Sequence, residues 1–381
     1  MNDRRLPKLR FKGFKDDWEQ RKVSEIFKIT RGYVLAATET ADIKDDKNCY
    51  PVYSSQTKNE GLMGFYSEYL YENAITWTTD GANAGTVRYR SGKFYCTNVC
   101  GVLLSEEGYA NKAVSEALNS VAWKYVSHVG NPKMMNNVMA DIEIVIPKLV
   151  KEQETISRYF DEIDDLITLH QRKLEKLKIV KKAMLENCFP KNGEKVPEFR
   201  FSGFTGDWEQ RKVGQLTNVL SASRVHKEEW AEDGVPFFRS SDVVSAFKGT
   251  ENEKAFISVE LYEQLAKSSG KLEKNDILIT GGGSIGIPYI MPDNKPLYSK
   301  DADLIWIKHS ANFDSIYLYT YFMSEEFREY LASISHTGTI AHYTIEQVKD
   351  TPVRLPSIDE QRKLGNFFVS LDHLITLHQR K

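Results

Sequence analysis

The sequence predicts an α+β fold built as a tandem repeat, in which two globular α/β domains alternate with two long helices. Two observations predict this fold. Residues 7–23 match residues 197–213 at 12 of 17 positions, and the octapeptide at 166–173 returns unchanged at 374–381. A repeat of this length decides the organisation before any single element is assigned. Because equivalent helices that pack antiparallel create an approximate two-fold axis, we expect a pseudo-two-fold repeat around an antiparallel coiled coil.

The repeat divides the chain into four parts. Residues 1–147 form the first globular domain and residues 148–190 the first helix. Residues 191–356 contain a linker and the second globular domain, and residues 357–381 form the second helix, which is either short or truncated. We name residues 7–22 and 197–212 the lead segments; they are nearly identical, whereas the regions that follow agree only in scattered places. One scaffold therefore carries two different domains.

The first helix has apolar residues at alternating spacings of four and three, the heptad pattern of a coiled-coil seam. A shift of 208 residues repeats the pattern in the second helix. The residues predicted to pack between the helices are Ile156, Phe160, Ile163, Ile167, His170, Leu174, Leu177, Leu364, Phe368, Leu371, Ile375 and His378. We interpret the two histidines as polar residues that fix the register of the pair, in preference to a metal-binding pair.

Short runs of β-branched and aromatic residues inside the globular domains end at Gly, Asn and Asp, which is typical of strands and turns. We expect strands at residues 74–78, 86–89, 101–104 and 142–145, and at 236–239, 277–280 and 304–307. Apolar residues at helical spacing predict helices at residues 112–125 and 315–331. Residues 73–85 also resemble residues 275–286.

The composition is that of an ordinary soluble protein, with 41% hydrophobic and 27% charged residues. No apolar run is long enough to cross a membrane, and the N-terminus lacks the hydrophobic part of a signal peptide, so we expect a cytoplasmic protein. The four cysteines fit reduced thiols better than a zinc site. A net charge of −2 does not suggest nucleic-acid binding, but a local basic surface would be enough for it.

Each helix begins with a Pro, a short spacer and Glu-Gln: Pro147 precedes Glu152-Gln153, and Pro356 precedes Glu360-Gln361. Together with the tandem order, these motifs resemble the specificity subunit of type I restriction-modification systems over essentially the whole chain. The resemblance implies that each globular domain is a target recognition domain, which reads one half of a bipartite, asymmetric site on double-stranded DNA. It also implies that the helices set the spacing of the half-sites and dock two modification subunits.

The resemblance further implies that catalysis belongs to the partners. The modification subunits of that family carry S-adenosylmethionine and methylate adenine at N6, and restriction subunits use ATP and Mg²⁺ to translocate and cut DNA. We therefore expect no cofactor, no metal and no catalytic residue in this chain. The sequence agrees, since it lacks the Asn/Asp-Pro-Pro-aromatic motif of an adenine methyltransferase and any paired nuclease signature. The alternatives are a stand-alone methyltransferase or nuclease with an unrecognised site, and a coiled-coil scaffold with no role on DNA.

Polar loops supply the candidate DNA contacts of the first domain. Asn and Gln can bond adenine, and Arg and Lys can bond guanine or a phosphate. The candidates are Ser55, Gln56, Lys58, Asn59, Thr79, Asn83, Arg88, Arg90, Lys133, Asn136 and Asn137. For any one of these residues, a solvated turn is about as good an interpretation.

The second domain offers a similar set, which includes a run of three glycines. The candidates are Arg239, Ser240, Ser241, Gly282, Ser284, Lys300, Thr339, His342 and Tyr343. Glycines let backbone amides approach a phosphate closely. No Gly-Lys-Ser/Thr follows them, so this is not a Walker loop, and a tight hairpin turn is the favoured interpretation.

Overall fold

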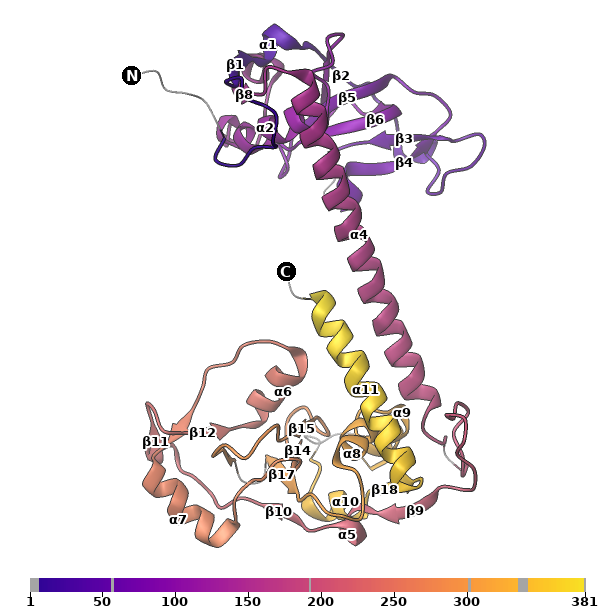
Figure 1. The fold of residues 1–381 in the computed structure, drawn as a ribbon, viewed down its shortest axis with the longest axis vertical. Coiled ribbons are helices and arrows are strands. Elements are labelled where there is room, and N and C mark those ends of the chain that lie inside the picture. The colour runs from indigo at the N-terminus through magenta and orange to yellow at the C-terminus, as the bar shows by residue number, and fades with distance from the viewer. Residues whose placement is uncertain (1–6, 56–57, 192, 301–302, 335–341, 380–381) are drawn as a thin grey trace. The chain divides into compact units, whose positions relative to one another are not determined.

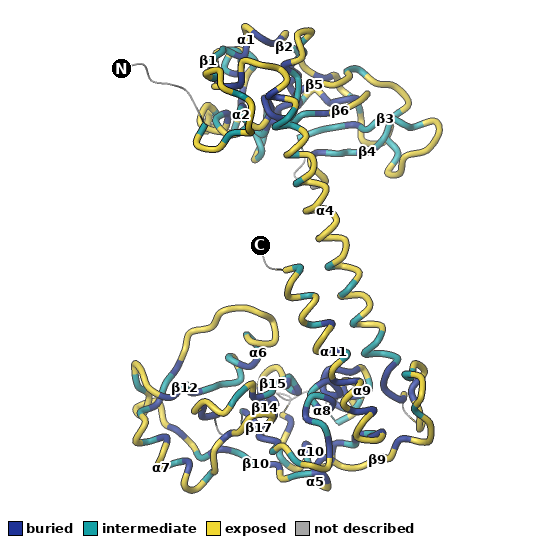
Figure 2. Tube along the Cα trace, in the orientation of Figure 1, coloured by how far each residue is buried: buried dark blue, intermediate teal, exposed yellow. Residues whose placement is uncertain are grey.

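The computed structural model describes residues 7–55, 58–191, 193–300, 303–334 and 342–379. The chain forms two compact units, Met1–Leu169 and His170–Lys381. Each unit contains strands and helices around its own buried apolar residues (Figures 1 and 2). The predicted α+β class is confirmed.

The first unit contains a six-stranded sheet in the order β2-β7-β5-β6-β3-β4 and a separate pair, β1-β8. Neighbouring strands are antiparallel except β3 and β6, which are parallel. Helix α2 packs on β6 and β8. The elements are β1 (Glu19–Lys22), α1 (Val23–Ile26), β2 (Lys28–Arg31), β3 (Tyr50–Tyr53), β4 (Leu62–Tyr66), β5 (Tyr71–Thr78), β6 (Val87–Cys96), β7 (Cys100–Leu104), α2 (Lys112–Ala122), α3 (Asn136–Asp141), β8 (Glu143–Ile146) and α4 (Val150–Asn187).

The second unit has two four-stranded sheets, β10-β17-β14-β15 and β11-β13-β12-β16, and the pair β18-β9. Its elements are β9 (Glu209–Lys212), α5 (Val213–Leu216), β10 (Val219–Ser221), β11 (Trp230–Ala231), β12 (Val235–Phe238), α6 (Ser240–Lys248), β13 (Phe256–Ile257), α7 (Val259–Ser269), β14 (Ile277–Thr280), β15 (Pro288–Ile290), β16 (Tyr298–Ser299), β17 (Leu304–Ile307), α8 (Ser315–Tyr321), α9 (Glu325–Ile334), α10 (Ile345–Asp350), β18 (Pro352–Leu355) and α11 (Ile358–Gln379).

The two units share a framework. The order β2-β7-β5-β6 in the first unit matches β10-β17-β14-β15 in the second, and the pairs β1-β8 and β9-β18 are equivalent. They differ in what is inserted: the first unit extends its sheet with β3 and β4, whereas the second adds a separate sheet and helices α6 and α7. The prediction of one scaffold with two different domains is confirmed at the level of strand order.

The Glu-Gln motif fastens the lead segment and the start of each long helix. Glu152 is 1% exposed and binds Arg10 through both carboxylate oxygens, with the Arg10 Nε and Nη2 atoms each 2.7 Å from an oxygen. The next residue turns back, so that Gln153 Nε2 donates to the Pro147 carbonyl at 2.7 Å. A buried ion pair is tolerated only with such geometry. The motif therefore has a structural role that explains its residue types.

The second copy repeats these contacts. Arg200 Nε and Nη2 each lie 2.8 Å from an oxygen of Glu360, and Gln361 Nε2 donates to the Pro356 carbonyl at 2.9 Å. Trp208 is 3% exposed within the core of the second unit. Trp208 is therefore a packing residue of the second lead segment.

Most of the predicted strands form, with small shifts at their ends, but the helix expected at 315–331 is wrong. It is split into α8 and α9, because Ser324 begins a new helix: its Oγ accepts from Phe327 N at 3.3 Å. A serine followed by acidic residues is a helix start signal. Elements β3, β4, α6 and α7 were not predicted; they belong to the inserted parts that differ between the units.

The two long helices are present, and they run antiparallel within the second unit. His170 of α4 contacts His378 of α11. Lys181, which comes later in α4, contacts Asp372, which comes earlier in α11, so the two helices run in opposite directions. Figure 1 shows α11 beside the C-terminal part of α4. Leu177 packs against the core cluster that contains Leu364, Phe368 and Leu371.

The predicted seam is not uniform along α4. In the first unit its N-terminal half packs on its own domain, where Gln153 Oε1 accepts from Asn111 and Ser157 Oγ accepts from Ala113 N at 2.9 Å. Ile156, Phe160 and Ile163 are only half-buried there, and Ile167 is exposed, so for this half the sequence pattern overstated the burial. Leu174 and Ile375 are half-buried in the second unit. The heptad pattern thus marks one apolar face, but this face meets different neighbours along its length.

Candidate nucleic-acid interface

The loop between β5 and β6 is held in place by the segment that precedes α3. Gly85 N donates to Thr78 O at 2.9 Å, which closes the loop. Gly81 N donates to Pro132 O, and Met134 N donates to Thr79 O at 2.8 Å. These backbone bonds do not depend on the identity of the side chains, so the loop can keep its shape while its exposed side chains differ.

The second unit builds the equivalent loop with the same bonds. Gly286 N donates to Thr280 O at 2.8 Å, and Tyr343 N donates to Gly281 O at 2.8 Å. Gly85 and Gly286 close the two loops at φ of 84° and 75°, a conformation that favours glycine. The three glycines form a hairpin turn between β14 and β15, as the sequence analysis favoured. The resemblance of residues 73–85 to 275–286 therefore reflects one shared loop frame.

The candidate residues of the first domain gather partly on this frame. Asn83 Nδ2 donates to Ser55 O at 3.4 Å, which joins the β5–β6 loop to the loop after β3. Asn59 is exposed with a φ of 49°, and Thr79 is buried, its hydroxyl bonded to Asp80 and Val99. Asn136 and Asn137 lie in the first turn of α3. Gln56 and the side chain of Lys58 lie outside the described residues.

Two cations of this set already have acidic partners. Arg88 lies 3.0 Å from Glu60, and Lys133 lies 3.7 Å from Asp80. Both pairs are exposed, so each partner is weakly bound and could be replaced by a phosphate. Arg90 differs, because its side chain is buried below the loops.

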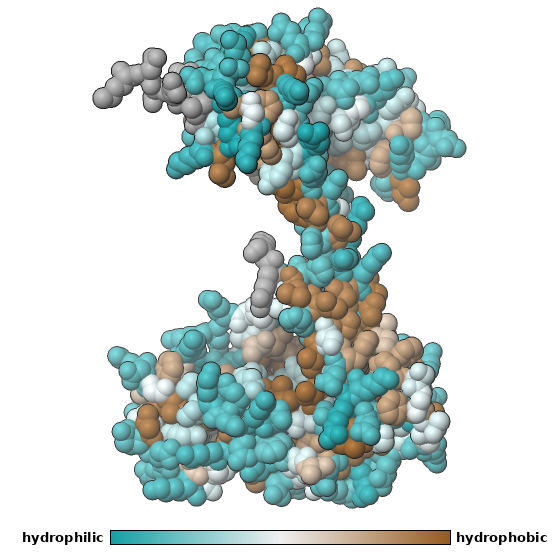
Figure 3. Space-filling model, viewed as in Figure 1, coloured by the Kyte–Doolittle hydropathy of each residue, from teal (hydrophilic) through white to brown (hydrophobic). Residues whose placement is uncertain are grey.

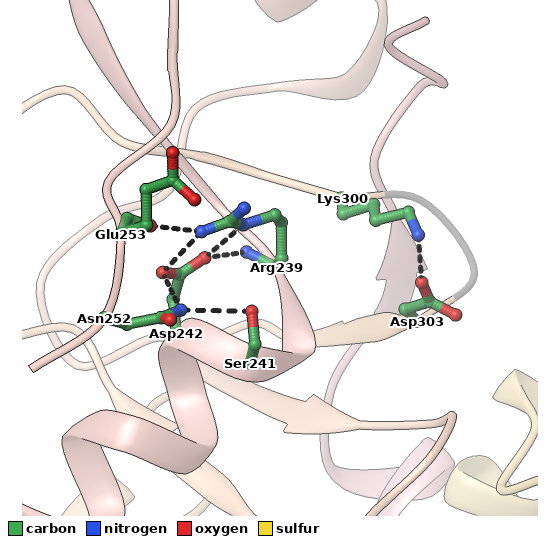
Figure 4. Close-up of polar contacts among 7 residues, drawn as sticks. All are labelled: Arg239, Ser241, Asp242, Asn252, Glu253, Lys300 and Asp303. Carbon is green, nitrogen blue, oxygen red and sulfur yellow. Dashed lines mark hydrogen bonds and ion pairs between the residues drawn. The ribbon is translucent and has the colours of Figure 1, made fainter. Parts of the chain in front are cut away.

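In the second domain, the stretch 239–242 is not the loop that the sequence suggested. It begins helix α6, and Arg239 N donates to Asp242 Oδ2 at 2.8 Å as part of a capping box. Figure 4 shows Arg239 enclosed by Asp242, Asn252 and the carbonyl of Glu253. Ser240 Oγ donates to Asp303 O at 2.9 Å, and Ser241 Oγ accepts from Asn252 at 3.1 Å. Asn252, which was not among the candidates, is therefore part of this cluster.

The charges of this cluster are matched internally. The hydrogen bond to Asp242 raises the pKa of Arg239. Burial opposes ionisation of Asp242, but hydrogen bonds from Arg239 and Asn252 outweigh it and lower the pKa of this carboxyl. Lys300 is paired with Asp303 in the same view (Figure 4). Arg239 therefore shapes the start of α6, and a contact with DNA would compete with Asp242.

The remaining candidates of this domain lie on or beside the glycine hairpin. Gly282 is buried and forms an isolated antiparallel β-bridge with His342. Ser284 and His342 are exposed. Tyr343 is 1% exposed, and its hydroxyl bonds Thr351, so in this structure it is a core residue and not a surface contact. Its apolar surroundings explain the aromatic residue type. Thr339 lies outside the described residues.

The helices carry no metal centre among the residues that the structure describes, where no group of three or more possible ligands is found. His170 Nδ1 and His378 Nδ1 are 2.8 Å apart, so one ring donates a hydrogen bond to the other. Equivalent residues of the two repeats thus contact each other. Across the same described part, no helix is long and apolar enough to cross a membrane.

Comparisons with known proteins agree with these features. A family model described as type I restriction modification DNA specificity domain matches residues 15–179 and 205–381. The chain is 24% identical over 389 residues to the type I restriction enzyme MjaVIII specificity subunit of Methanocaldococcus jannaschii, covering 96% of this chain and 88% of that protein. It is 37% identical over 135 residues to the type I restriction enzyme MpnII specificity subunit of Mycoplasma pneumoniae, covering 35% and 40%. The crystal structure of a type I restriction-modification S subunit from M. genitalium has a similar fold, with a TM-score of 0.58 and 15% identity over 98% of this chain and 94% of that one.

Proposed function

We propose that this chain reads a bipartite, asymmetric DNA site with one half under each globular domain. The chain belongs to the family of type I restriction-modification DNA specificity proteins and is a specificity subunit of such a system. The observation that carries the proposal is the shared strand framework with different inserts. A common frame places the two domains on DNA in the same way, and unlike inserts present different side chains to the bases. The two half-sites are then different sequences.

The long helices set the distance between the half-sites. Helix α4 has 38 residues and is one continuous element, which at 1.5 Å per residue makes it about 57 Å long. A DNA-binding pair of domains reads half-sites about one helical turn, roughly 34 Å, or more apart. A continuous helix of this length is stiff enough to hold such a spacing.

The same helices dock two modification subunits, and restriction subunits join that assembly. Exposed apolar side chains on the helices support this proposal, among them Leu166 at 55%, Leu169 at 52% and Ile179 at 66% exposure. Figure 3 shows apolar side chains gathered along α4 and α11 on this face. Apolar side chains clustered on a surface often mark a protein interface.

The chain itself is non-catalytic in this proposal. Its sequence lacks an adenine methyltransferase motif. S-adenosylmethionine, ATP and Mg²⁺ belong to the modification and restriction subunits. Methylation or cleavage of DNA by the purified chain alone would contradict this part of the proposal.

Exchange of one domain tests the bipartite reading. Residues 27–142 are replaced by those of another family member, which leaves the β1-β8 pair and α4 in place, and modified adenines are mapped across a genome that also expresses the modification subunit. We expect one half of the recognised site to change and the other half to stay. The matched control replaces residues 217–351, which should change the other half only. A change in both halves after either exchange would contradict independent reading by the two domains.

A further inference from the structure

A small polar cavity lies below the loops of the first domain. It has a volume of about 100 Å³ and is lined by side chains from the end of β3, from β5 and β6, and from the β5–β6 loop. The lining includes the cations Arg88 and Arg90, the acidic residue Glu60, and the hydroxyl-bearing residues Ser54, Thr76 and Thr78. The cavity thus lies where the two loops with candidate DNA contacts are joined by Asn83 and Ser55.

Arg90 is the buried charge of this cavity, with 8% of its surface exposed. Its guanidinium carbon stacks 3.7 Å from the centre of the Tyr53 ring, its Nε donates to Thr76 Oγ1 at 3.2 Å, and its Nη2 donates to Glu60 O at 2.7 Å. All three partners are uncharged groups. Within the described residues, Arg90 forms no ion pair and its Nη1 donates to no acceptor.

Among the described residues, this lack of a counter-ion separates Arg90 from four other candidate cations. Arg88, Lys133, Arg239 and Lys300 are each paired with a carboxylate. Glu60 also lines the cavity, but its carboxylate is bound to Arg88 and, among the described residues, forms no ion pair with Arg90. Burial accordingly lowers the pKa of Arg90. A buried charge without a partner is unfavourable unless an opposite charge is supplied.

The size and the polar groups of the cavity indicate which kind of group supplies the opposite charge. At about 100 Å³ the cavity is well below the roughly 300 Å³ of small-molecule pockets. A phosphate group, which is smaller than a base, suits a cavity of this size. The hydroxyl of Ser54 accepts from Thr97 at 3.0 Å, which leaves its own proton to donate. With Thr78 and Arg90, it offers donors to an anion.

We propose that this cavity binds one backbone phosphate of the DNA, held by Arg90 together with Ser54 and Thr78, and so positions the first domain on its half-site without reading a base. The inference rests on the proposed function and deepens it. Phosphate contacts fix the register of a protein on a duplex and carry no sequence information directly. Arg90 is therefore a positioning residue, and Tyr53 and Thr76 hold its guanidinium in place.

The test uses the chain in complex with its modification subunits and a duplex that contains the recognised site. A series of duplexes carries a single uncharged methylphosphonate at each position of the half-site in turn. With the natural protein, we expect one position to weaken binding about tenfold, as for loss of a hydrogen bond to a charged group. No substitution in the protein is needed for this measurement, so it does not depend on whether a variant folds.

The variant Arg90→Gln then links that position to the cavity. Since each neutralised phosphate contributes about 0.9 to the slope of log affinity against log salt, the slope should fall by about 1, with the base preference unchanged. The methylphosphonate at the sensitive position should no longer weaken binding by the variant. Lys271→Gln removes an exposed cation of the second unit that is already paired with Glu263, so it is the matched control and should leave this position sensitive.

The outcomes separate this inference from the proposed function. If the natural complex binds no bipartite site, the proposed function fails. If it binds normally but no methylphosphonate weakens it, or the sensitive position is equally sensitive in Arg90→Gln, the phosphate site alone is refuted. A changed base preference in Arg90→Gln would also refute it, because the residue would then read a base.

Discussion

Removing the buried carboxylate at the start of α11 should release the second lead segment. In Glu360→Gln the volume is kept, but the side chain loses its charge and presents an NH₂ group where Arg200 also donates. Breaking a buried ion pair by removing one partner costs about 3–5 kcal/mol. The side chain of Arg200 is 18% exposed and still donates hydrogen bonds to the carbonyls of Gly206 at 2.7 Å and Thr205 at 3.1 Å. We therefore expect a cost at the lower end of this range, about 3 kcal/mol.

Hydrogen exchange measured by mass spectrometry on residues 197–213 is the suitable assay, because a chain with two units has no single unfolding free energy. We expect these amides to lose protection by about 3 kcal/mol in the free energy of opening. The matched control is Glu346→Gln, which removes an exposed partner of Lys349 and should change protection by less than about 0.5 kcal/mol.

A double variant separates the ion pair from packing. Replacing both partners, as Arg200→Met with Glu360→Gln, leaves no buried charge and should recover part of the lost protection. If Glu360→Gln behaves like the control, or the double variant loses more than the two single variants added together, the ion pair does not fasten the lead segment and the explanation of the Glu-Gln motif is refuted.

Two further predictions concern the helix spacing and the effect of pH. Insertion of seven helical residues after Asp165, where α4 is exposed, lengthens the helix by about 10 Å, so the mapped half-sites should move apart by about three base pairs at 3.4 Å each; unchanged spacing would contradict the helix as the spacer. Burial, opposed by Arg354 at 3.6 Å, raises the pKa of Glu326 from 4.5 to about 7. Because the folded state then holds a proton that the unfolded state releases, stability of the second unit should fall as pH rises from about 4.5 to about 7. Glu326→Gln should remove this fall, measured as the urea midpoint against pH, and an unchanged profile would count against the assignment.

The sequence predicted the parts of the site unequally. The glycine hairpin and the shared loop frame were predictable, because glycines at fixed positions mark turns whatever surrounds them. The role of Arg239 was not, since its partners Asp242 and Asn252 come together only when α6 forms. Arg88 and Arg90 look alike in the sequence, and because they lie two residues apart on one strand they face the same side and both line the cavity. Only the structure shows that Arg90 is buried against Tyr53 and Thr76, whereas Arg88 is paired with Glu60.

By itself the sequence determined the duplication, the two α+β domains, the long helices and the family, because residues that recur at fixed spacing indicate each of these features. Only the tertiary structure decided which side chains are committed to partners. It placed Tyr343 in the core and paired Arg239 and Lys300 with acids, and it left Arg90 buried with no counter-ion in the part of the chain that the structure describes. The physical reason is that burial and charge pairing depend on residues far apart in the chain, whereas a repeat or a heptad pattern is local.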